Sequence, residues 1–135
     1  MPVRLLAALA LVAALAAGCG SSTPKPYTAA GTAPCLRTNG FTGVTTNAGK
    51  VGFVAGFADN GGIRATSADG NTVTIAFAAD DSGVAGTEDA FKRQATGTYK
   101  THIADVMESR GNAVLVWATT PAQQTLNLAL GCLHS

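Results

Sequence analysis

The sequence predicts an α+β fold: one small domain over residues 34–135, with a mostly antiparallel sheet built from two hairpins and helices packed on one face. Three observations indicate this fold. Segments 63–78 and 102–118 each show a strand pattern on both sides of a turn. Helical patterns follow these hairpins instead of alternating with single strands. A chain of 135 residues is long enough for one modest core and too short for two.

The domain is expected to begin with a short helix and a strand. Pro34 suits the first turn of a helix and Asn39–Gly40 supplies a left-handed stop, so Pro34–Thr38 is predicted to be helical, with Cys35 facing inward. The next segment, Phe41–Thr46, is rich in Thr and Val, which favour strands.

An apolar run, Val51–Ala58, follows and ends at the turn-forming sequence Asp59–Gly62. Periodicity alone does not distinguish a buried strand from a helical segment in so short a run. Its shortness and its two glycines favour a strand. On this interpretation Phe53 and Phe57 are core residues.

Two hairpins are predicted further along the chain. Ile63–Ala78 alternates apolar and polar residues on both sides of Asp69–Gly70, a frequent turn sequence. His102–Met107 and Ala113–Ala118 flank a second turn at Ser109–Asn112. The return strand of this second hairpin is apolar on both faces, so we expect it to be central in the sheet.

Two helices complete the expected domain. Asp80–Ser82 can cap the first, although two glycines delay its expected start to about Thr87, and Gly97 should end it. Thr120–Gln123 has the capping-box pattern, with Pro at the first helical position, and predicts the start of the second. The inward stripe of this last helix comprises Leu126, Ala129, Leu130 and Leu133.

The N-terminal residues 1–18 are expected to be a secretory signal peptide. Arg4 gives a charged start, and Leu5–Ala17 contains only Leu, Ala and Val. This length fits the apolar region of a signal peptide, about 7 to 15 residues, and is short of the roughly 20 residues that span a bilayer. The sequence therefore predicts export and not a permanent membrane helix.

The segment Leu15–Cys19, with small residues before the cysteine, resembles the lipobox of bacterial lipoproteins. Ala16 stands where that family most often has Leu. The resemblance implies that the Cys19 thiol receives a diacylglycerol and that the leader is removed before Cys19. An ordinary secretory leader, which would leave Cys19 as a free thiol, is the alternative.

The resemblance implies a location at the bacterial cell envelope, with the lipid in the outer face of the cytoplasmic membrane or in an outer membrane. Residues 19–33 are mostly small, polar or Pro and lack apolar periodicity, so we expect a flexible tether. Cys35 and Cys132 are the remaining cysteines. In an oxidising compartment this even pair predicts a disulfide that joins the first and last elements of the domain.

Charge and motifs exclude several classes of function. The chain has 9 Lys and Arg against 8 Asp and Glu, and removing Arg4 with the leader leaves the mature side chains without net charge. This balance excludes a typical nucleic-acid-binding protein, which concentrates basic residues. The sequence has no spacing typical of a metal site and no fingerprint for a nucleotide cofactor. We therefore expect neither cofactor nor metal.

No recognisable catalytic set is present, which favours a non-catalytic domain that binds an envelope protein or a small ligand. Trp117 and His102 are the residues we consider for ligand contact, although Trp117 also suits the core and His102 a surface position. The alternative is a small envelope enzyme, a hydrolase that uses His102 with Asp105.

Overall fold

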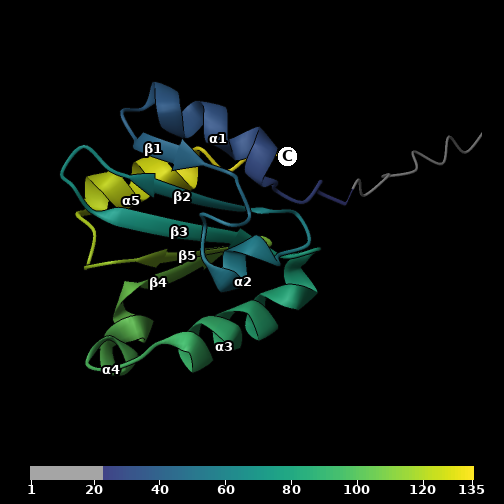
Figure 1. Ribbon diagram of the computed structural model, residues 1–135. Helices are drawn as coiled ribbons and strands as arrows, with labels where there is room; N and C mark the ends of the chain where they lie inside the picture. The colour runs from purple at the N-terminus through teal and green to yellow at the C-terminus, as the bar shows by residue number, and fades with distance from the viewer. Residues whose placement is uncertain (1–22) are drawn as a thin grey trace, which may run out of the picture.

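A five-stranded antiparallel sheet forms the centre of the fold in the computed structural model, which describes residues 23–135 (Figure 1). The strand order is β1-β2-β3-β5-β4, and the strands are β1 (Thr42–Thr45), β2 (Gly62–Thr66), β3 (Thr72–Phe77), β4 (Met107–Arg110) and β5 (Ala113–Trp117). The helices are α1 (Ala29–Thr38), α2 (Phe53–Gly56), α3 (Val84–Gln94), α4 (Tyr99–His102) and α5 (Gln123–Gly131). The predicted α+β class is confirmed.

Both predicted hairpins form. In the first, β2 pairs with β3 and Ile63 lies opposite Ile75; in the second, β4 pairs with β5 and Glu108 lies opposite Leu115. The two hairpins join because β5 also pairs with β3, which places Ile75 next to Leu115. Every residue of β5 is buried, as expected for a strand covered on both faces.

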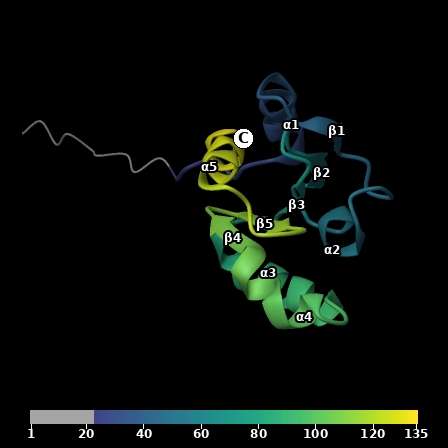
Figure 2. The ribbon, with the colours of Figure 1, turned by 90° about the vertical axis from the view of Figure 1, so that its left-hand side faces the viewer.

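Helices cover both faces of the sheet (Figure 2). The sequence predicted helices on one face of the sheet. α1 and α5 share such a face, the one that carries Ile63, Ile75 and Leu115. On the other face, α2 lies against β2, and Glu88 of α3 accepts a 2.5 Å hydrogen bond from the Ser109 hydroxyl of β4. The second layer is needed because β5 is apolar on both faces and all of its residues are buried.

The predicted disulfide between Cys35 and Cys132 joins α1 to the end of α5. The two Cα atoms are 5.3 Å apart, a usual separation for a disulfide. The Asn39 amide nitrogen lies 3.3 Å from the Cys35 sulfur and 3.5 Å from the Cys132 sulfur. The disulfide closes a loop that contains the whole sheet.

The first helix begins earlier than predicted, within the expected tether. α1 starts at Ala29, and the Thr28 hydroxyl caps it by accepting a 3.0 Å hydrogen bond from the Gly31 amide. The Thr28 amide donates to the His134 carbonyl at 2.9 Å, so the two ends of the domain lie side by side. The inner side of this helix consists of the fully buried Leu36 and of small residues such as Ala33, which pack closely. The tether prediction is therefore wrong for residues 28–33; residues 19–22 lie outside the described part of the chain.

The segment predicted as the strand His102–Met107 is helical up to Val106. α4 ends at His102, a 3₁₀ turn spans Ile103–Val106, and β4 begins only at Met107. Ile103 and Val106 are both buried. Their spacing of three residues matches one helical turn and not the two-residue period of a strand.

The two longer C-terminal helices differ from the predictions at their starts. α3 begins at Val84, directly after a 3₁₀ turn that Asp80 caps. Hydrogen bonds from Ser82 to this carboxylate lower the pKa of Asp80. α5 begins at Gln123 instead of Pro121, and the capping box is absent. Asn71 is hydrogen-bonded to the Thr119 carbonyl at 2.8 Å and to the Thr119 amide at 3.2 Å, within a bend that precedes this helix.

The described helices include none with the length and apolar character needed to cross a bilayer. The predicted signal peptide and Cys19 lie outside residues 23–135.

Candidate functional site

The apolar run predicted as a strand forms one helical turn, α2, on the surface of the protein. Val51 and Ala55 are buried, whereas Phe53 and Phe57 are 64% and 79% exposed. Each pair is separated by four residues, so in a helix the two pairs point in opposite directions. The prediction that Phe53 and Phe57 are core residues is therefore wrong.

Two glycines allow α2 to form at this place. Gly52 precedes the helix with φ +92°, a left-handed conformation that favours glycine. Gly62 begins β2 directly beneath the helix, where a Cβ atom would lie 2.4 Å from the Ala55 carbonyl oxygen. This close approach seats the turn on the sheet and directs its two aromatic side chains outward.

Phe53 and Phe57 form what we call the aromatic ridge. Their ring centroids are 4.9 Å apart and their planes are tilted by 53°. This contact lies in the preferred range for aromatic pairs and restricts the rotamers of both rings before any partner binds. Exposed aromatic side chains are unfavourable in water. Burying one such side chain removes about 150 to 250 Å² of surface from water, which is favourable. The ridge is thus a surface feature that favours contact with another molecule.

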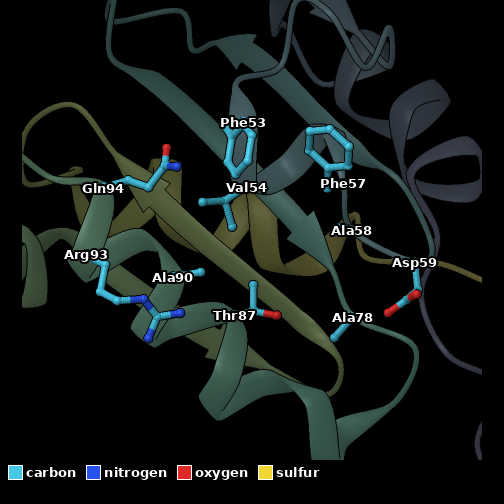
Figure 3. Close-up of a pocket in the computed structure, with 10 residues that line it drawn as sticks. All are labelled: Phe53, Val54, Phe57, Ala58, Asp59, Ala78, Thr87, Ala90, Arg93 and Gln94. Carbon is cyan, nitrogen blue, oxygen red and sulfur yellow. The ribbon is translucent and has the colours of Figure 1, made fainter.

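Next to the ridge lies the α2–α3 groove, a hollow of about 620 Å³ (Figure 3). The ridge and Val54 form one wall, and α3 forms the other. Ala58 and Ala78 lie between the two walls, and the α3 wall presents the short side chains of Thr87 and Ala90. Because these side chains are short, the groove has room for a large apolar group from outside.

Two charged residues, Asp59 and Arg93, line the groove. Figure 3 shows them on opposite sides of the short side chains, with Arg93 projecting from α3 and Asp59 following α2. Both are exposed, and neither forms an ion pair within residues 23–135. The groove therefore has a positive end and a negative end beside an apolar wall.

Protein-family models, curated proteins and solved structures contain no match to this chain. The function must therefore be inferred from the chemistry of the surface.

A second hollow, of about 490 Å³, lies over the sheet on the same face, and Gln94 lines both. Its lining includes Arg64, Thr74 and Tyr99. The Tyr99 hydroxyl donates a 2.7 Å hydrogen bond to the Trp117 carbonyl, and burial raises the pKa of Tyr99. Tyr99 therefore acts as a neutral structural donor, and the second hollow has a mixed polar and apolar lining beside the groove.

His102 and Asp105 do not form a catalytic arrangement. Their side chains are 70% and 73% exposed, and the 3.7 Å between Nδ1 and Oδ2 exceeds hydrogen-bond length. Within the described part of the chain, no hydroxyl or thiol is hydrogen-bonded to either side chain. His102 lines a hollow of about 330 Å³ together with Tyr99 and residues of the following segments.

Trp117 is 1% exposed and packs in the core, so its ring is not available to a ligand at the surface. Its indole nitrogen has no hydrogen-bond partner among the described residues. The same residues contain no cluster of three or more His, Cys, Asp or Glu side chains that could hold a metal ion.

The aromatic ridge is the feature that the sequence interpretation missed. The signal was present, since Phe53 and Phe57 are four residues apart and so are Val51 and Ala55. This pattern indicates one helical turn with an apolar side toward the core and an aromatic side toward solvent. In so short a run, the two glycines favoured the prediction of a strand over this helical pattern.

Proposed function

We propose that this protein is a lipid-anchored component of the bacterial cell envelope whose domain is a non-catalytic binding module, with the aromatic ridge and the α2–α3 groove as its binding surface. The exposure of Phe53 and Phe57 carries the proposal. Aromatic and Arg side chains are enriched at protein interfaces and account for much of their binding free energy. The ridge supplies the aromatic anchors, and Arg93 supplies a cation beside them.

The resemblance of Leu15–Cys19 to a lipobox supports the anchor. Two acyl chains are expected to give stable attachment, because each buried methylene contributes about 0.8 kcal/mol. The disulfide is consistent with this location, since disulfides persist in oxidising compartments. The separated, exposed His102 and Asp105 give the alternative of a hydrolase no support.

Metabolic labelling with a palmitate analogue tests the anchor. We expect the full chain, expressed in bacteria, to carry label and to fractionate with the envelope. Cys19→Ala should lose both the label and envelope retention, because Cys19 is the predicted acylated sulfur. The control is Cys35→Ala, which should keep the label. Equal labelling of wild type and Cys19→Ala would contradict the anchor.

In-cell photo-crosslinking tests the binding surface. A benzoylphenylalanine placed at Phe57 retains an aromatic side chain on the ridge and should give adducts larger than the monomer. The matched control is the same residue at Leu128, an exposed apolar position on α5, on the other face of the sheet. Adducts that are no more abundant from position 57 than from position 128 would contradict the proposed surface.

A further inference from the structure

We propose that the partner of this surface is a second copy of the chain, and that the aromatic ridge of each copy occupies the α2–α3 groove of the other in a two-fold symmetric dimer. This inference rests on the proposed function for the choice of surface and for the membrane anchor. The identity of the partner follows from the shape and the charge of the groove.

The shape argument is that the ridge and the groove are adjacent on one surface. Phe57 is 79% exposed and stands at the edge of a hollow of about 620 Å³ lined by short side chains. A two-fold axis that passes beside the ridge would bring Phe57 of each copy over Ala78 and Ala90 of the other. Each copy then contributes one protruding group and one receiving hollow.

A ridge and a groove far apart on the molecule would join copies head to tail, in a ring or an open chain. Here Phe53 and Phe57 belong to both the ridge and the lining of the groove, so a single two-fold contact can include both features and close after two copies. A different hollow lies on the other side of the ridge and is lined by Gly49, Gly52 and Gly56. Because glycine has no side chain, these residues place no bulky group beside the two rings.

The charge argument is that the groove is self-complementary. Among the residues that line it, only Asp59 and Arg93 are charged, and they lie on opposite sides of the short side chains (Figure 3). A two-fold axis between them brings Asp59 of one copy toward Arg93 of the other, and the reverse pair forms at the same time. Neither residue forms an ion pair within the described part of its own chain, so both are available.

A foreign partner would have to match this opposed pair of charges and the apolar ridge together. The second copy matches them by symmetry. The anchor adds a physical advantage, because confinement to a membrane raises the effective concentration of one copy near another. A dimer that is weak in dilute solution would then be populated at the envelope.

The test is in-cell photo-crosslinking of the full chain from position 57, combined with charge reversal. We expect a product with the mass of two copies. Asp59→Arg or Arg93→Asp alone should lower its yield about tenfold, since each places like charges opposite each other across the interface. The double variant with Asp59→Arg and Arg93→Asp should restore the yield, because the reciprocal pairs form again with exchanged sides.

Co-expression of the two single variants with different tags gives a second rescue. The mixed dimer pairs Arg at position 59 with Asp at position 93, and Arg93 with Asp59, so it should form more abundantly than either variant with itself. Retention of the Cys35–Cys132 disulfide on non-reducing gels shows that each variant is folded.

Unchanged yield in both single variants, or no rescue in the folded double variant, would overturn the dimer. Adducts only to another protein or to a small ligand would also overturn it, and would leave the proposed binding surface in place. Absence of any adduct above the level from position 128 would overturn both proposals.

Discussion

Replacing both disulfide cysteines, Cys35→Ala with Cys132→Ala, will lower the free energy of unfolding by about 4 kcal/mol. The two cysteines are 97 residues apart, so the bond restricts nearly the whole unfolded domain. On the chain-entropy model a loop of about 100 residues contributes about 4.7 kcal/mol, and measured losses for small secreted domains are about 2 to 5 kcal/mol. The double variant avoids a free thiol.

Urea denaturation of the wild type and the double variant, with and without reductant, measures this effect. Reductant should bring the wild type close to the stability of the double variant and leave the double variant itself unchanged. A loss below about 1 kcal/mol would show that the packing of α1 against the sheet, without the covalent bond, closes the domain.

Asn112→Ala is expected to cost about 3 kcal/mol. Asn112 is 1% exposed, and its side chain connects the N-terminal segment to the sheet. Its amide oxygen accepts from the Tyr27 amide at 2.7 Å, and its amide nitrogen donates to the carbonyls of Tyr27 and Ala78 at 2.9 and 2.7 Å. Alanine leaves these groups without their partner in a buried place, which is costly for each group.

Urea denaturation together with hydrogen exchange at the Tyr27 amide checks this prediction, and exchange there should become faster. Asn71→Ala is the matched control, since Asn71 makes a similar pair of bonds to the Thr119 backbone at 2.8 and 3.2 Å in a solvent-accessible place. It should cost about 1 kcal/mol or less. Equal losses in the two variants would contradict the role of burial.

The hairpins and the disulfide could be predicted because their signals are local or chemical. Alternation in Ile63–Ala78 sets which side chains face the core, and Asp69–Gly70 fixes the turn. Two cysteines in a domain that is predicted to be exported leave one pairing. These features do not depend on knowing what else packs nearby.

Other elements were missed because tertiary contacts decide them. α1 begins at Ala29 since the Thr28 amide binds the carbonyl of His134 at the far end of the chain. α5 starts late because Asn71 fixes the preceding bend through two hydrogen bonds to the Thr119 backbone. Thr28 and His134 are far apart along the chain, and so are Asn71 and Thr119. The local sequence therefore does not reveal either contact.

The candidate site was the least predictable part. Phe53 and Phe57 are among the largest apolar residues of the chain, and such residues are usually buried. Their exposure follows from the close seat that Gly62 gives to α2, a contact between two elements. The lipid attachment at Cys19 is instead a prediction from a linear pattern, which needs no folded structure and stays to be tested by labelling.

The adjacency of the two ends of the domain decides where a reporter can be attached. Because the Thr28 amide binds the His134 carbonyl at 2.9 Å, a fluorescent protein fused after Ser135 would emerge beside the first turn of α1. That place is on the far side of the sheet from α2 (Figure 2). Such a fusion would occupy the side of the domain where α1 begins and leave Phe57 unobstructed, so imaging at the carboxyl end is compatible with the proposed pairing through the groove.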